Sequence, residues 1–97
     1  MERRLTAILA ADVVGFTRLM GADEAGTLAA LKKVRTDLID RKVSEHQGRT
    51  FKLTGDGMLA EFPSVVNAVA CAVELQRGVN QRNADVPPDR RINFASA

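Results

Sequence analysis

The sequence contains no tryptophan or tyrosine, and it has only four phenylalanines, one cysteine and three prolines among its 97 residues. A hydrophobic core must therefore consist mainly of Val, Leu, Ile and Ala side chains. The lone Cys71 excludes an internal disulfide. Because it lies in an apolar helical pattern, we expect a small buried side chain in a reducing compartment. No run approaches the ~20 apolar residues of a membrane span, and Asp12 interrupts the apolar run that follows Arg3 and Arg4. The sequence thus predicts a cytoplasmic protein without a membrane segment or a secretory signal.

Charge is nearly balanced, with 14 basic and 12 acidic residues and a formal net charge of +2. The basic residues form scattered pairs without neighbouring aromatic side chains to stack on bases, so a nucleic-acid surface is not expected. A hydrophobic fraction of 45% and a charged fraction of 27% are typical of a folded globular chain. The length predicts one small domain over residues 1–97.

The most informative stretch is FKLTGDGMLAEF, which runs from Phe51 to Phe62. Phe51 and Leu53 alternate with polar residues, the period-two pattern of a half-buried strand, and an apolar strand resumes at Met58. Between them, the sequence Thr-Gly-Asp-Gly at 54–57 predicts a hairpin turn with Asp56 at its tip. Taken alone, an Asp-Gly turn is most often only a turn.

Two further strands are predicted on either side of this hairpin. Residues 5–14 form a nearly continuous apolar run, which predicts a central strand buried on both faces and ending near Asp12. A carboxylate at the end of such a strand is costly to bury unless it is paired or binds a cation. Alternation from Arg91 to Phe94 predicts the start of a last strand.

Helical patterns fill the segments between the strands. Gly15 permits a sharp turn into a short helical turn at residues 16–20, and a long helix is predicted from about Asp23, its N-cap, to about His46, with Gly48 as its stop. A second long helix begins after Ser64, its N-cap, and fades near residue 83. The predicted buried stripes comprise Leu28, Leu31, Val34, Leu38 and Ile39 in the first, and Val65, Val66, Val69, Ala72, Val73, Gln76 and Val79 in the second.

This element order predicts an α+β fold of the ferredoxin-like βαββαβ type, with helices on one face of the sheet. In such a sheet the first strand lies beside a hairpin strand in the middle. The end of the first strand and the hairpin turn then lie at the same edge. Asp12 and Asp56 are therefore predicted to meet in space.

Two neighbouring carboxylates repel each other, and a hard divalent cation removes that penalty. A pair of Mg²⁺ or Mn²⁺ ions ~3.5–4 Å apart can activate an attacking oxygen and stabilise a leaving one, as nucleotidyl transfer requires. The backbone from Val13 to Phe16 would offer further polar groups beside the phosphates. The alternative is purely structural, with Asp12 capping the short helix and Lys52 solvated on its strand.

Two motifs carry a resemblance to a known family. ADVVGFT at residues 11–17 resembles the metal-binding opening motif of class III adenylate/guanylate cyclases, and FKLTGDG at residues 51–57 resembles their second motif. The segment LAEFP at 59–63 and the alanine-rich helix after it fit bacterial members. The resemblance extends from Arg3 to Phe94, and two motifs at the right separation are more specific than either one.

The resemblance implies an adenylate cyclase that converts ATP to cyclic AMP and pyrophosphate with two Mg²⁺ or Mn²⁺ ions at a homodimer interface. Asp12, Val13 and Asp56 would hold the metals, and the two aspartates would be catalytic. Lys52 would select adenine for the nucleotide held by the partner subunit. The remaining residues assigned to substrate binding are Val13, Gly15, Phe16, Thr17 and Gly55.

Family catalytic domains are longer than this chain, so the resemblance covers the N-terminal part of one. The residues that orient the ribose and stabilise the transition state lie in the remainder, and we expect weak or no activity from the 97 residues alone. A non-catalytic module that binds metal and nucleotide, or that pairs with an intact cyclase subunit, is therefore the alternative. A phospho-acceptor receiver domain fits less well, since it requires a parallel βα repeat and an acidic pair after the first strand.

Overall fold

A computed structural model describes residues 6–96, so Arg3, Arg4 and Leu5 lie outside the described residues. The element order is the predicted one. The elements are β1 (Ala7–Val13), α1 (Phe16–Ala22), α2 (Glu24–Val34), a π-helical turn (Arg35–Ile39), α3 (Asp40–Glu45), β2 (Arg49–Leu53), β3 (Gly57–Phe62), α4 (Val65–Asn83), a 3-10 turn (Pro88–Arg90) and β4 (Phe94–Ser96).

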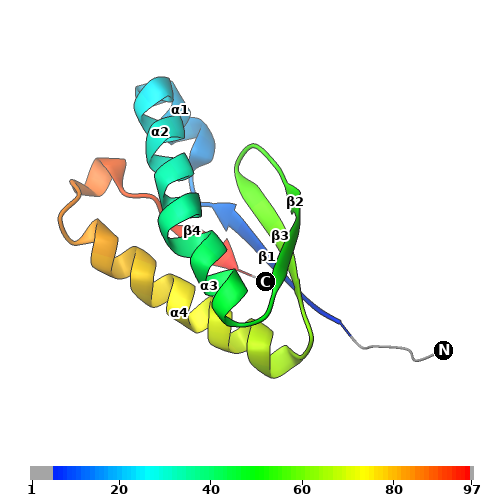
Figure 1. The fold of residues 1–97 in the computed structure, drawn as a ribbon. Coiled ribbons are helices and arrows are strands. Elements are labelled where there is room, and N and C mark those ends of the chain that lie inside the picture. The colour runs from blue at the N-terminus through cyan, green and yellow to red at the C-terminus, as the bar shows by residue number, and fades with distance from the viewer. Residues whose placement is uncertain (1–5, 97) are drawn as a thin grey trace.

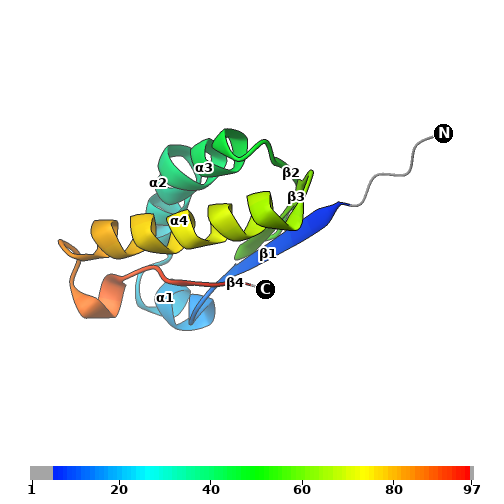
Figure 2. The same cartoon turned by 90° about the horizontal axis from the view of Figure 1, so that it is seen from below.

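The four strands form one sheet in the order β2-β3-β1-β4, with every neighbouring pair antiparallel. The long helical segment α2–α3 and helix α4 lie next to each other on one side of this sheet (Figures 1 and 2). Their buried side chains join those of β1 and β3 in one core cluster, which includes Leu38, Val43, Leu75, Leu9 and Phe62. The predicted α+β, ferredoxin-like arrangement with helices on one face is confirmed.

Strand β1 is buried on one face only, so the prediction of burial on both faces was wrong. Leu9, Ala11 and Val13 are buried under the helices, whereas Ile8 is 58% exposed and Asp12 is exposed. Alternate side chains of a strand point to opposite faces, so Ile8 and Asp12 belong to the face that the helices leave open. A continuous apolar run cannot show which of its faces is covered.

Strands β2 and β4 also differ from their predicted patterns. Phe51 and Leu53 are 42% and 53% exposed, because β2 is an edge strand whose outer side has no neighbour within the described sheet. β4 begins at Phe94 and not at Arg91. The residue before it, Asn93, already accepts a hydrogen bond from the Val14 backbone N–H at 2.8 Å, beyond the end of β1.

The predicted helix from Asp23 to His46 is continuous from Glu24 to Glu45, but a π-helical turn interrupts its α-helical repeat. Asp23 caps it as predicted, since its side chain accepts from the Gly26 N–H at 3.0 Å. Leu28 is 45% exposed, against prediction, because the buried side of α2 runs through Thr27 and Leu31, four residues apart. Gln47, at φ 61°, takes the left-handed position expected at Gly48.

Helix α4 begins after the predicted cap, Ser64, and ends at the predicted residue. Its buried positions, however, are Ala68, Cys71, Leu75, Val79 and Asn83. Four valines of the predicted stripe are instead exposed by 44–75%, namely Val65, Val66, Val69 and Val73. The small residues Ala68 and Cys71 let the first half of the helix approach the sheet closely, whereas Leu75 and Val79 fill the contact in its second half.

Cys71 is fully buried in this core, as predicted. Burial raises the pKa of the Cys71 thiol to about 11, because desolvation disfavours the thiolate. The thiolate is the reactive form of cysteine, so this side chain acts as a packing residue and not as a nucleophile.

A polar cluster joins the end of α3 to α4. Glu74 accepts from Lys42 Nζ at 3.0 Å and lies 2.6 Å from His46 Nε2, and Lys42 also pairs with Glu45. The hydrogen bond from Lys42, followed by that from His46, lowers the pKa of Glu74. The unfolded chain therefore binds this proton more readily. The contribution to stability is complete above the unfolded carboxyl pKa of ~4.3, and it is lost as pH falls through the lower folded-state value.

Glu74→Gln should lower the urea midpoint of unfolding at about pH 7, and the difference from the wild-type chain should shrink towards about pH 3, where wild-type Glu74 is itself neutralised. Equilibrium urea titrations at both pH values measure this. Asp85→Asn, at an exposed loop position, is the matched control and should show a smaller difference at both. A Glu74→Gln difference that is constant with pH would contradict this role for the cluster.

Candidate functional site

Asp12 and Asp56 are brought together at one end of the sheet, as the sequence predicted. Asp12 pairs with Gly57 in the β1–β3 register, and the Val13 backbone N–H donates to the Asp56 carbonyl at 2.7 Å. The Asp12 side chain extends over Gly57, where a Cβ would lie 2.3 Å from Asp12 Oδ1. The hairpin turn is closed by the Thr54 N–H, which donates to the Gly57 carbonyl at 2.9 Å. Two carboxylate-bearing residues and Val13 therefore share one sheet edge.

Lys52 lies on the same open face as Asp12 but on a different strand. It pairs with Leu59 of β3, and Leu59 pairs with Ala10 of β1, two residues before Asp12. Paired residues of adjacent strands point to the same face. Because β2 and β1 flank β3, Lys52 and Asp12 are separated by two strand spacings, about 10 Å across the sheet, and by two residues, about 7 Å, along the strands. The open face thus presents a cation and a carboxylate that do not touch.

The segment after β1 turns sharply into α1. Gly15 has φ 66° and ψ 33°, a left-handed conformation that favours glycine, and its carbonyl accepts the Leu19 N–H at 3.0 Å. Thr17 is exposed in the first turn, whereas Phe16 packs against the cluster that contains Val13 and Leu19. Gly55 is exposed at the hairpin turn. Of the predicted substrate residues, only these turn residues and Val13 border the two aspartates; Lys52 stands apart.

The donor set suits Mg²⁺ or Mn²⁺ better than a metal that needs a closed protein cage. Residues 6–96 contain no group of three or more His, Cys, Asp or Glu side chains arranged to hold a metal. Mg²⁺ commonly takes one or two carboxylates and completes its shell with water and substrate phosphate. Asp12 is exposed and Asp56 half-buried, so both carboxylates remain open to such ligands.

Sequence reasoning treated Gly57 only as a turn residue, whereas the structure gives it a second role. Its missing side chain leaves the space that Asp12 occupies, and a Cβ would also lie 2.6 Å from the Ala11 carbonyl. Asn93 was likewise not singled out, although its carbonyl binds the Val14 N–H beside the site. A glycine directly opposite a carboxylate in a predicted strand pair would have been the available signal for the role of Gly57.

Replacing Gly57 with alanine should displace Asp12 and lower the free energy of unfolding by ~1–3 kcal/mol, because overpacking against a strand backbone cannot be relieved by a side-chain rotation. Gly55→Ala is the matched control, since a Cβ there meets no atom within 4 Å. Urea unfolding of both variants tests this. Equal stability of Gly57→Ala and Gly55→Ala would show that the backbone around Asp12 can move at little cost in free energy.

No protein-family model matches the chain. It is 51% identical over 92 residues to a Rhizobium meliloti (strain 1021) protein named "Putative adenylate cyclase 3", a match that covers 95% of this chain and 16% of that protein. It is 30% identical over 91 residues to the serine/threonine-protein kinase pkn2 of Myxococcus xanthus, covering 94% of this chain and 11% of that protein. The chain therefore spans a small part of each of these relatives.

Among solved structures, the chain is similar to an adenylate/guanylate cyclase/hydrolase from Silicibacter pomeroyi, with a TM-score of 0.87 and 44% identity over 98% of this chain and 55% of that one. The guanylyl cyclase Cya2 gives a TM-score of 0.79 at 23% identity, covering 98% of this chain and 53% of that one, which shows a shared fold. Both likenesses agree with the two motifs and with the sheet order. In sequence over 95% of its length, and in fold over 98% of it, the chain is similar to adenylate/guanylate cyclases.

Proposed function

We propose that this chain is the N-terminal portion of an adenylate cyclase catalytic domain, with Asp12 and Asp56 as its metal-binding pair. The observation that carries the proposal is their meeting at one sheet edge, where the Val13 N–H donates to the Asp56 carbonyl at 2.7 Å. The relatives' names support a cyclase, and the motif residues support the position of its site.

In the proposed reaction, the ribose 3′-oxygen of ATP forms a bond to the α-phosphorus while the bond from that phosphorus to the bridging oxygen of pyrophosphate breaks. The 3′-hydroxyl proton is lost to solvent. The Asp12 and Asp56 carboxylates, with the Val13 backbone, would hold two Mg²⁺ or Mn²⁺ ions. Such ions would supply charge neutralisation at the phosphates and acidify the attacking hydroxyl. Residues Gly15 to Thr17 and Gly55 border the phosphates.

Lys52 is proposed to select the base and not to act on the phosphates. Its distance of two strands from Asp12 supports this separation of roles. A lysine ammonium donates hydrogen bonds and accepts none, so it suits an acceptor on the adenine edge. A site built across two open sheet faces would let Lys52 of one subunit serve a nucleotide held by the aspartates of its partner, which is the reason we propose a homodimer.

The 97 residues span 55% of the similar solved cyclase chain, and we propose that the ribose- and transition-state-binding groups come from polypeptide outside them. The exposed valines of α4, together with Ile8 on the open sheet face, are apolar surface that further polypeptide would cover. The second candidate function rests on the same surface. The chain would then be a non-catalytic module that binds metal and nucleotide or pairs with a cyclase subunit.

Cyclic AMP formation from ATP and Mn²⁺ by the purified chain tests these functions, with Asp56→Ala as the control. We expect turnover to be low or absent, since removing a single charge-stabilising group costs ~10²–10³ in rate. Product that disappears in Asp56→Ala would establish an enzyme in the 97 residues themselves. A folded chain without product that still binds Mn²⁺ and ATP would favour the binding module, whereas one that binds neither would overturn the site.

Where product forms, Lys52→Glu should lower the ratio of ATP to GTP turnover, because a carboxylate repels acceptors on the adenine edge and accepts from the guanine edge. Lys32→Gln, at an exposed position of α2, removes a charge of the same sign away from the sheet and is the control. An unchanged ratio in Lys52→Glu would exclude the base-selecting role.

A further inference from the structure

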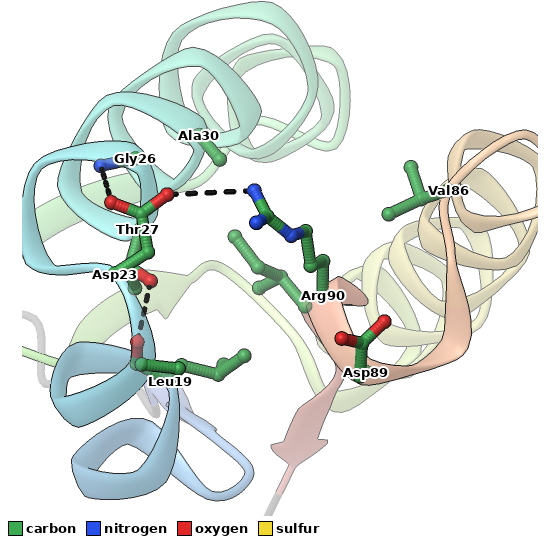
Figure 3. A pocket seen from close by; sticks show the side chains of 10 residues that line it. Leu19, Asp23, Gly26, Thr27, Ala30, Val86, Asp89 and Arg90 are labelled. Carbon is green, nitrogen blue, oxygen red and sulfur yellow. Dashed lines mark hydrogen bonds and ion pairs between the residues drawn. The ribbon is translucent and has the colours of Figure 1, made fainter.

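A cavity of about 260 Å³ lies between α1, α2 and the loop that precedes β4 (Figure 3). Its wall is mainly apolar, with Leu19 from α1, Ala30 from α2, and Val86 and Ile92 from the loop. Drug-sized ligands occupy sites of ~300–1,000 Å³, so this cavity suits a smaller molecule. It shares none of its lining residues with the Asp12–Asp56 edge.

Hydrogen bonds hold each side of this cavity in place. The Thr27 hydroxyl donates to the Leu19 carbonyl at 3.0 Å, which fixes α1 against α2. On the loop side, Arg91 Nε donates to the Val86 carbonyl at 2.9 Å, and Asn83 Nδ2 donates to the Ile92 carbonyl at 3.0 Å. A cavity with fixed walls does not have to be ordered by its ligand, which lowers the cost of binding.

Three charged side chains line the cavity, namely Arg90, Asp23 and Asp89. Arg90 Nη1 lies 3.5 Å from Asp23 Oδ2. A dashed line in Figure 3 marks this ion pair. Asp23 has another partner, because its Oδ1 accepts the Gly26 N–H as the cap of α2. The Arg90 side chain is 67% exposed, and its contact with Asp23 is long. An exposed ion pair of this kind contributes little, so the guanidinium is the polar group that a ligand can recruit.

We propose that this cavity binds small monocarboxylates with a short apolar body, with Arg90 pairing to the carboxylate and the apolar body lying against Leu19, Val86 and Ile92. Arginine presents a planar fork that matches a carboxylate with two parallel hydrogen bonds. A cationic ligand would instead pair with Asp89, and comparison with hexylamine distinguishes the two ligand classes. The site is independent of the proposed cyclase chemistry.

Titration of the ¹⁵N-labelled 97-residue chain with sodium hexanoate, followed by amide chemical shifts, tests the proposal. We expect the largest shifts around residues 19–30 and 86–92, and binding up to about fivefold tighter than that of the uncharged hexanamide, the gain expected of an exposed ion pair. Arg90→Gln should remove the preference for hexanoate and leave hexanamide binding unchanged. Arg77→Gln removes an exposed arginine of α4 outside this cavity and should change neither.

Ala30→Leu fills the cavity while Arg90 stays in place, and it should abolish binding of both compounds. Asp56→Asn should leave hexanoate binding unchanged, which separates this site from the proposed nucleotide site. The proposal is overturned if hexylamine binds more tightly than hexanoate, if hexanoate shifts map elsewhere, or if Arg90→Gln binds hexanoate as the wild-type chain does. The spectra themselves report whether each variant is folded.

Discussion

Asp12→Asn and Asp56→Asn should each weaken Mn²⁺ binding by roughly 30-fold, and the double variant should bind no more Mn²⁺ than the background of surface carboxylates. Two unit charges 4 Å apart interact by ~1 kcal/mol in water, so one carboxylate beside a divalent ion contributes ~2 kcal/mol. Both carboxylates lie where water reaches them, which makes the value for water the relevant one.

Paramagnetic broadening of amide signals by Mn²⁺ measures this directly and needs no catalysis. In the wild-type chain it should centre on residues 12–17 and 54–57, the two segments joined by the hydrogen bond from the Val13 N–H to the Asp56 carbonyl. Asparagine keeps the shape of the side chain above Gly57, so a loss of broadening reports charge and not repacking. Asp40→Asn, an exposed carboxylate on α3, should leave the broadening intact.

Broadening that persists in the double variant would remove the metal site and the proposed cyclase role of this edge together. Broadening lost in Asp12→Asn but retained in Asp56→Asn would point to a single ion on Asp12. Either result would be independent of the cavity beside Arg90, whose test involves no metal.

Features of the chain that depend on local chemistry were predictable from the sequence. The caps at Asp23 and Ser64, and the turn at Asp56 and Gly57, each follow from a few adjacent residues, and the structure contains all three. The meeting of Asp12 with the hairpin followed from element order, because few sheet topologies accommodate that order.

Which side chains of a helix or strand are buried depends on the elements that pack against it, and this was not predictable from adjacent residues. The valines of α4 are exposed because Ala68 and Cys71, which are smaller, face the sheet. Leu28 is exposed because the buried side of α2 runs through Thr27 and Leu31, and a polar residue such as Thr27 does not mark a buried side in the sequence. The space that Gly57 leaves for Asp12 depends on the register of two strands, which the composition of neither strand specifies.

Phe62→Ala should lower the free energy of unfolding by ~3–5 kcal/mol, the cost of removing a large buried aromatic side chain. Phe62 is 1% exposed and is one of the two largest fully buried side chains of the described residues. A chain of this length has a total stability of roughly 5–15 kcal/mol, so the variant should be close to unfolding at room temperature. Urea unfolding followed by circular dichroism measures the change.

Gly48 allows a second test of the packing around Phe62, because a Cβ at residue 48 would lie 2.4 Å from Phe62 Cε2. Gly48→Ala alone should cost ~1–3 kcal/mol by overpacking. The Gly48 φ lies outside the left-handed region, so alanine adds a contact and no backbone strain. In the Phe62→Ala background the ring is absent, and the added methyl group should cost little or even fill part of the cavity.

A double-mutant cycle over these two residues therefore has a predicted sign. The double variant should lose less unfolding free energy than the sum of the losses in the two single variants. The difference, the coupling free energy, should be ~1 kcal/mol or more. Additive losses would mean that the chain between α3 and β2 moves away from the ring at no cost. In that case Phe62 would be held by β1, β3 and α4 alone, and the close approach of Gly48 would have no part in fixing the hairpin that carries Asp56.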